Sequence, residues 1–160
     1  MVNDTPKLRA RWLAKLVAVG AALAFSMSSA ATAAETSTLC VKVPSANFRS
    51  GPGTDHDIVF IADQFFPVKV LEKQKGWVKV QDFEKETAWI AEQLLSKDDT
   101  CVVRVKRGNL RDAPGTKSEV VGHVGYGEAF RIVKRDGHWL QVATTKKTIG
   151  WIRDDLAWGD

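Results

Sequence analysis

The sequence predicts an all-β protein: two tandem small β-barrels, preceded in the precursor by the helix of a signal peptide. Three observations predict this fold class: an internal repeat with a constant offset, short runs of alternating apolar and polar residues, and turn-forming residues between the runs. The stretch NFRSGPGT at residues 47–54 returns as NLRDAPGT at residues 109–116, which is 62 positions later. A period of this length that occurs only twice indicates two copies of one small domain and not a solenoid.

Residues 1–34 have the layout of a secretory signal peptide, with a basic opening, the apolar run LVAVGAALAF at residues 16–25, and then small residues. The cleavage expected from this layout follows Ala33 or Ala34. The alternative is a membrane anchor, but a spanning helix needs about 20 predominantly apolar residues. We therefore expect an exported protein of the periplasm, the extracellular space or the cell envelope, with no stable membrane anchor after cleavage.

Most of the net positive charge of the chain lies in residues 1–34. The full sequence has 23 Lys+Arg against 19 Asp+Glu, and residues 1–34 hold four of the bases and one of the acids. The remainder has 19 bases against 18 acids, a net charge of +1. A nucleic-acid-binding protein needs a dense basic patch that displaces the counterions of the phosphate backbone. We therefore expect no nucleic-acid partner.

Each copy of the repeat contains one clear antiparallel hairpin. In the first copy, residues 68–70 (VKV) and 77–80 (WVKV) alternate apolar and polar side chains, with a charged, glycine-containing turn between them. In the second copy, residues 129–133 (AFRIV) and 139–142 (WLQV) do the same. This alternation is typical of half-buried strands that are joined by a turn.

The remaining segments are short, which favours a barrel. Residues 91–95 (AEQLL) and 153–156 (RDDL) are each long enough for one helical turn. The GPGT and APGT segments must be loops, because proline lacks the N–H group that a sheet centre requires. A flat sheet in a domain of about 60 residues would leave an apolar face and two edges exposed, so we expect closed barrels.

The motif N-x-R-x-G-P-G-T, followed by an apolar strand, G-W-x-K-V and G-W-I, resembles the bacterial SH3-like (SH3b) domain of exported proteins. The resemblance recurs twice at one spacing. Repeat two has Ala113 in place of the first glycine of the turn, and repeat one has Ala88 where Gly150 stands in repeat two. The domain organisation that follows is a signal peptide at 1–34, a short segment at 35–40, SH3b domains at 41–96 and 102–160, and a linker at 97–101.

The resemblance places the repeated phrase in the long loop after the first strand, where it packs back across the barrel. The residues agree with a scaffold role. Asn47 and Asn109 can bond to neighbouring backbone groups. Arg49 and Arg111 offer several donors for loop carbonyls. We expect the scaffold role to dominate, and direct ligand contact by these residues is the alternative.

The tryptophans are the main candidates for ligand binding. Val78 and Val80 share one face of their strand, so Trp77 is expected on the other face and partly exposed; the same reasoning exposes Trp139. In SH3-like domains a tryptophan at this strand start borders the peptide-binding groove. The alternative is that each tryptophan closes one end of its barrel, which we expect of Trp89 and Trp151. The candidate groove residues are Trp77, Trp139, Arg49, Arg111 and Tyr126, the only tyrosine of the chain.

The two cysteines of an exported chain suggest a disulfide. The chain ends of SH3-like barrels lie close together, so the resemblance makes a bridge between Cys40 and Cys101 reasonable, worth about 4 kcal/mol on the chain-entropy model. The rival is a catalytic cysteine, but His56, His123 and His138 are scattered over both repeats. No zinc-like spacing is present, so we expect no metal and no cofactor.

The expected function is therefore that of an exported, non-enzymatic binding protein. Its tandem SH3b domains would recognise peptidoglycan or an envelope protein or peptide. The alternative is an interaction scaffold or accessory subunit that has no affinity for the cell wall. An enzyme such as a cell-wall peptidase is not expected, because the repeats leave no room for a separate catalytic domain. The sequence does not identify the ligand, the number of repeats that bind it, or the oligomeric state.

Overall fold

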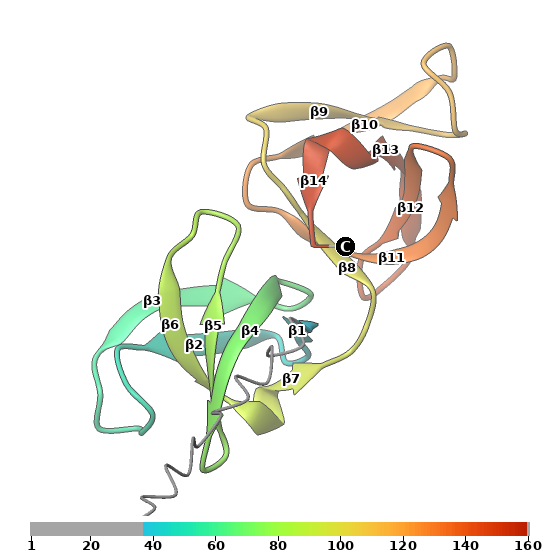
Figure 1. Cartoon of the computed structure of the whole chain (residues 1–160). Coiled ribbons are helices and arrows are strands. Elements are labelled where there is room, and N and C mark those ends of the chain that lie inside the picture. Colours follow the sequence, from blue (N-terminus) through green and yellow to red (C-terminus); the bar gives the residue numbers. More distant parts are fainter. Residues whose placement is uncertain (1–36, 160) are drawn as a thin grey trace, which may run out of the picture. The chain divides into compact units, whose positions relative to one another are not determined.

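The computed structural model describes residues 37–159 and contains two seven-stranded antiparallel sheets (Figure 1). The elements of the first sheet are β1 (Thr38–Val41), β2 (Ser45–Arg49), β3 (Ile58–Asp63), β4 (Pro67–Gln74), β5 (Trp77–Gln81), β6 (Thr87–Ala91), the 3₁₀ turn η1 (Glu92–Leu94) and β7 (Leu95–Ser96). Those of the second are β8 (Thr100–Val103), β9 (Arg107–Arg111), β10 (Val120–Gly125), β11 (Ala129–Asp136), β12 (Trp139–Ala143), β13 (Thr148–Arg153), η2 (Asp154–Leu156) and β14 (Ala157–Trp158). The predicted all-β fold with two tandem domains is confirmed, and residues 1–34 lie outside the described residues.

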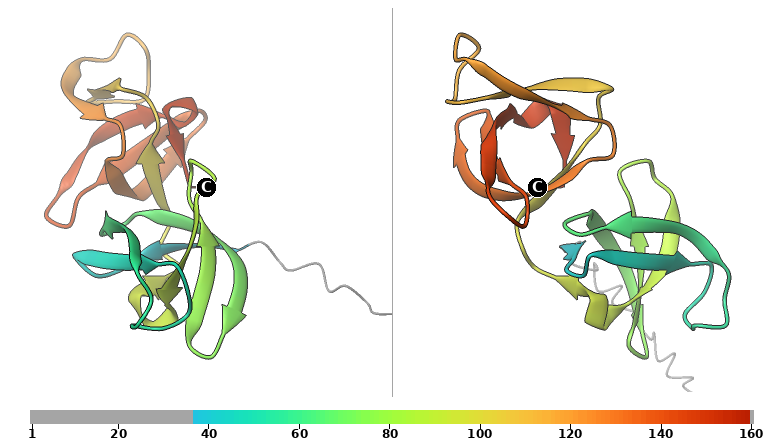
Figure 2. Two further views of the ribbon diagram at one scale, coloured as in Figure 1. Left: turned by 90° about the vertical axis from the view of Figure 1, so that its left-hand side faces the viewer. Right: turned by 180° about the vertical axis from the view of Figure 1, so that it is seen from behind.

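The two sheets have the same topology. The strand order is β3-β2-β6-β5-β4-β1-β7 in the first sheet and β10-β9-β13-β12-β11-β8-β14 in the second. The central hairpins β4–β5 and β11–β12 are those that the alternating pattern predicted. Figure 2 shows from two further sides that each sheet curls round on itself into a small barrel. The curvature gives each barrel an interior that the alternating apolar side chains fill.

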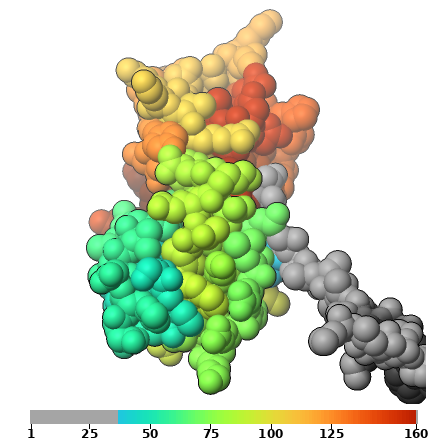
Figure 3. All heavy atoms as spheres, turned by 60° about the vertical axis from the view of Figure 1, so that its left-hand side comes forward, coloured from blue at the N-terminus to red at the C-terminus, as the bar shows by residue number. Residues whose placement is uncertain are grey.

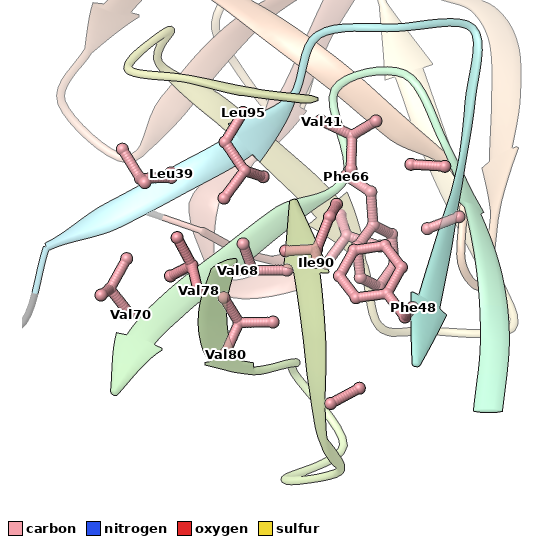
Figure 4. Close-up of a cluster of buried hydrophobic side chains, with 14 residues drawn as sticks. Leu39, Val41, Phe48, Phe66, Val68, Val70, Val78, Val80, Ile90 and Leu95 are labelled. Atoms are coloured by element: carbon pink, nitrogen blue, oxygen red, sulfur yellow. The ribbon is translucent and has the colours of Figure 1, made fainter. Parts of the chain in front are cut away.

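The core of the first barrel collects one face of each strand (Figure 4). Val78 and Val80 are buried. Trp77, which precedes them, and Lys79, which stands between them, are only partly buried, as predicted. The apolar stretch QFFPV at residues 64–68 adds an aromatic residue to this core. Phe66 packs edge-on against Phe48 with the ring centroids 6.3 Å apart. Further core residues of this barrel are Leu39, Val41, Val68, Val70, Ile90 and Leu95.

The second barrel repeats this pattern with smaller side chains. Phe130 is its buried phenylalanine, and the remaining core residues are aliphatic apart from Cys101. The predicted single helical turns are also present, as η1 and η2. Within residues 37–159, no helix has the length and apolar character that a membrane span requires. The core residues of the second barrel include Val103, Leu110, Val124, Ile132, Leu140, Val142 and Ile152.

The repeated phrase does not lie wholly in a loop, which corrects the expectation from the resemblance. Residues 47–49 are the end of β2 and residues 109–111 are the end of β9; only the following residues form the loop. The reason is the alternation around Phe48 and Leu110, which are buried while the asparagine before each of them is exposed. The alternating pattern covers only five residues in each copy, and the proline and glycine that follow it led us to expect a loop for the whole phrase.

The predicted disulfide is not present in the structure, in which both cysteines are buried thiols. Strands β1 and β8 are equivalent at an offset of 62 residues, whereas Cys40 and Cys101 are 61 residues apart. Because side chains alternate along a strand, the two thiols point to opposite faces of equivalent strands. Cys101 packs in the core of the second barrel. Cys40 points away from the core residues Leu39 and Val41, and its Sγ lies 3.2 Å from Ser96 Oγ.

Candidate binding grooves

Each barrel has a groove on its surface, and the same elements form it in both. The strand β2 with its following loop, the start of β5 and the turn η1 line the first groove, whose volume is about 660 Å³. In Figure 3 these segments meet on one face of the first barrel, teal for residues near 50 and yellow-green for residues near 90. The equivalent elements β9, β12 and η2 line the second groove, of about 310 Å³.

Every residue that lines the second groove has its equivalent, 62 positions earlier, in the lining of the first groove. This agreement shows that the repeat in the sequence is also a repeat of surface shape. Four of the predicted candidates are among them, two in each groove, and the structure therefore brings each tryptophan and arginine of the prediction together. The matched pairs are Asn47 and Asn109, Arg49 and Arg111, Thr54 and Thr116, Trp77 and Trp139, and Leu94 and Leu156.

The two arginines hold the loops that border the grooves. Arg49 Nη1 donates a hydrogen bond of 2.7 Å to the carbonyl oxygen of His56, seven residues ahead. Arg111 Nη1 donates one of 2.6 Å to the carbonyl oxygen of Ser118, at the equivalent place. A guanidinium group suits this role because it presents several donors in a fixed plane. The scaffold role expected of these arginines is therefore seen in both barrels, and their remaining N–H groups border the groove.

The tryptophans divide into two pairs with different environments. Trp77 and Trp139 begin β5 and β12, are half-buried, and line the grooves. Trp151 is buried, with 6% of its surface exposed, and Lys134 Nζ lies 6.0 Å from the centre of its ring. Trp89, its counterpart in the first barrel, is half-buried. Neither Trp89 nor Trp151 lines a groove, and the expectation that each closes one end of its barrel stays a prediction.

Two expectations about polar groove residues need correction. Asn47 and Asn109 are exposed and line the grooves, but neither amide side chain hydrogen-bonds to backbone among the described residues. The extended backbone of a strand directs these side chains outward, out of reach of their own neighbours. Tyr126 lies between β10 and β11 with half of its surface exposed, and it lines neither groove.

Sequence reasoning missed the residues that make the two grooves different. Ser45 and Ala91 line the first groove, and their equivalents in the second groove are Arg107 and Arg153. The longer arginine side chains occupy space that is open in the first barrel, which accounts for the smaller second groove. The signal for these positions is the constant offset itself, since each pair is 62 residues apart. Only the structure shows that both positions border the groove.

The histidines of the described region do not line the two grooves, and Glu92 is the one acidic residue that does. His138 Nδ1 lies 3.0 Å from Asp154 Oδ2 in the turn region of the second barrel. The hydrogen bond from His138 lowers the pKa of the Asp154 carboxyl below its ordinary value. Between residues 37 and 159, no three His, Cys, Asp or Glu side chains gather in a way that could hold a metal ion.

Comparisons with known proteins found similar sequences, similar solved structures and a matching family. A 24% identical relative over 142 residues is a candidate N-acetylmuramoyl-L-alanine amidase, YrvJ, of Bacillus subtilis (strain 168). The match covers 82% of this chain, which spans about a quarter (27%) of that relative. One similar solved structure is an NlpC/P60 family protein from Bacillus cereus ATCC 10987, at 15% identity and a TM-score of 0.36, over 76% of this chain and 56% of that one. Another is the CBD of the endolysin LysPBC5, at 14% identity and a TM-score of 0.30, over 76% of this chain and 92% of that one.

A third is NlpC2 from Trichomonas vaginalis, at 16% identity and a TM-score of 0.34, over 78% of this chain and 48% of that one. All three scores are too low to support a statement about this chain. The family comparison is decisive. The family described as the bacterial SH3 domain matches residues 44–96 and 106–157, which together are more than half of the sequence and contain both grooves. The chain belongs to the bacterial SH3 domain family, of which it carries two tandem copies.

Proposed function

We propose that the chain is an exported binding protein that recognises peptidoglycan, or a protein partner of the cell envelope, through its two grooves, and that it catalyses no reaction itself. One observation carries this proposal: both barrels present a groove that is lined by a half-buried tryptophan and by an arginine that fixes the adjoining loop. A groove that is present twice, with the same tryptophan and arginine at equivalent positions, favours recognition of a repetitive ligand.

The chemistry of the grooves suits a sugar or an extended peptide. A half-buried indole offers a rigid apolar face for stacking, and its neighbours offer polar groups that fix the orientation of a ligand. In the first groove the polar groups include Asn47 and Gln93, and the apolar ones include Ala46 and Leu94. Because the loop is already tied by Arg49, the groove needs little reordering when a ligand binds, which favours affinity.

The curated relative supports peptidoglycan as the ligand. The name of that relative describes an enzyme that acts on the bond between N-acetylmuramic acid and L-alanine, which is a bond of peptidoglycan. This chain matches only a part of the relative. A binding module that is shared with such a protein would hold it against the same polymer. Export by the signal peptide that we expect in residues 1–34 would bring this chain to the compartment where the polymer is found.

The test is co-sedimentation of residues 35–160, which contain both complete sheets, with purified sacculi. The proposal predicts that the folded protein pellets with sacculi and that Arg131→Ala, an exposed position on β11 outside both grooves, pellets equally. Folded protein that stays in the supernatant would reject peptidoglycan as the ligand and favour the interaction scaffold without wall affinity. Release of soluble fragments from the sacculi would show that the protein is an enzyme.

A further inference from the structure

The second groove has a positive charge that the first groove lacks. Among the residues that line it are Arg107, Arg111 and Arg153, and no acidic side chain is among them. The first groove has one arginine, Arg49, and one acid, Glu92. The whole domains differ in the same sense: residues 102–160 have 11 Lys+Arg against 7 Asp+Glu, and residues 41–96 have 7 against 8.

The donors of the three arginines remain available to a ligand. Arg111 uses Nη1 for the carbonyl of Ser118 and keeps its other N–H groups. Arg107 is exposed, and its side chain makes no hydrogen bond or ion pair with another residue of the described region. Arg153 Nη2 lies 2.6 Å from Asp155 Oδ2, with 47% and 53% of the two side chains exposed. An ion pair this exposed contributes little, so a ligand anion can compete with Asp155.

The first groove has no positive charge at the positions that are equivalent to Arg107 and Arg153. Ser45 and Ala91 are uncharged. Glu92 lines the groove, and its Oε1 lies 2.6 Å from the Nζ atom of Lys73, a residue that is not part of the lining. The difference therefore comes from two substitutions at equivalent positions, which also narrow the second groove to about half the volume of the first. A narrow site with several guanidinium groups fits a small planar anion, because a guanidinium and a carboxylate form two parallel hydrogen bonds.

We propose that the second groove binds the carboxylate group of a peptide ligand beside Trp139, and that the first groove takes an uncharged segment. This inference rests on the proposed function only in treating the groove as a ligand site. The carboxylate lies against Arg107 and Arg153, while Arg111 holds the loop and lends its remaining donors. Because Arg107 and Arg153 are exposed, added salt weakens their contact with the carboxylate.

The experiment is an NMR titration of ¹⁵N-labelled residues 35–160 with the peptide acetyl-Ala-Ala-Ala, which has a free terminal carboxylate, and with the same peptide as an amide. We expect the carboxylate peptide to shift the indole N–H signal of Trp139 much more than that of Trp77. The amide should bind the second groove about tenfold more weakly, as expected for the loss of charge-assisted hydrogen bonds. Inorganic phosphate is the competing anion; if it displaces the peptide at concentrations below the peptide's own Kd, the carboxylate assignment is wrong.

The variants exchange the residues of the two grooves, so each new side chain already exists in a folded copy of the domain. The double variant Arg107→Ser with Arg153→Ala should lose the preference for the carboxylate, and Ser45→Arg with Ala91→Arg should create it near Trp77. Arg131→Ser removes a positive charge outside both grooves and should change nothing. ¹⁵N spectra confirm that each variant is folded before titration.

Two outcomes overturn the inference: equal binding of the carboxylate and amide peptides, or an unchanged preference after the exchange. These outcomes are distinct from failure of the proposed function. A carboxylate preference without binding to sacculi keeps this site and rejects the wall ligand. Binding to sacculi without a carboxylate preference rejects this site alone.

Discussion

Replacing Gly150 by alanine should destabilise the second barrel. Gly150 has a φ of 145°, which side chains rarely adopt, and it lies in β13 directly against β9. A Cβ atom at this position would lie 2.6 Å from the carbonyl oxygen of Arg111 and 2.9 Å from Leu110 Cγ. The first of these neighbours is backbone, which cannot turn aside as a flexible side chain can.

The magnitude follows from two contributions. A non-glycine residue in a sparsely populated backbone region costs about 1–3 kcal/mol. Overpacking against a well-filled barrel costs a further amount of about 1 kcal/mol or more. A total of about 2–4 kcal/mol lowers the melting temperature of a domain of this size by at least about 8 °C.

The assay is thermal unfolding of residues 35–160, followed by NMR signals from each barrel separately. The matched control is Ala88→Gly, because Ala88 is the equivalent position of the first barrel and is buried there with 2% of its surface exposed. That variant should cost about 0.5–1 kcal/mol through backbone entropy and affect the first barrel. If Gly150→Ala melts within about 2 °C of the wild type, the close approach of β13 to Arg111 is wrong.

The remaining predictions concern the site, the cysteines, an ion pair and the leader. Trp77→Ala and Trp139→Ala should weaken binding to sacculi or to a partner by about 1–3 kcal/mol with small losses of stability, as measured by pelleting and by melting. Arg49→Ala and Arg111→Ala should mainly lose stability, about 1 kcal/mol each. The reverse pattern would mean that the arginines bind the ligand and the tryptophans stabilise the fold. Cys40 and Cys101 should react with a thiol reagent without prior reduction, but only in denaturant; protein from the envelope that stays unmodified there would establish the disulfide predicted from the sequence. The His138 hydrogen bond lowers the folded-state pKa of Asp154, so its stabilisation is present above the ordinary value of 3.8 and is lost as the pH falls through the lower folded value. Asp154→Asn should be less stable than wild type at pH 6, and this difference should shrink as the pH falls below 3.8. N-terminal sequencing of the exported protein should begin at Ala34 or Glu35, and retention of residues 7–25 would contradict the leader prediction.

The features that the sequence predicted correctly are local or periodic. The hairpin of β4 and β5, whose second strand begins at Trp77, was predictable because alternation over a few residues also decides which side chains face the core. The same reasoning placed Trp139 half-exposed at the start of its strand. The repeat added a second, independent copy of each pattern, so every local assignment was supported twice.

The features that were missed depend on contacts between distant strands. Arg153 borders the second groove because β13 pairs with β9, a neighbour more than 40 residues earlier in the chain, and no local pattern carries that information. The cysteines show how a one-residue shift matters. Their spacing differs from the repeat offset by one, which is enough to turn Cys40 out of its barrel core while Cys101 faces inward.

The central claim is that the two equivalent grooves are the ligand sites, and ¹⁵N NMR with soluble peptidoglycan fragments tests it most directly. Residues 35–160 contain five indole N–H groups, which report on groove and non-groove tryptophans in one spectrum. The account predicts saturable shifts for the indoles of Trp77 or Trp139 and for the backbone of β2 or β9, with those of Trp89 and Trp151 nearly unchanged. Shifts confined to Trp89 and Trp151, or to surfaces outside both grooves, would contradict it.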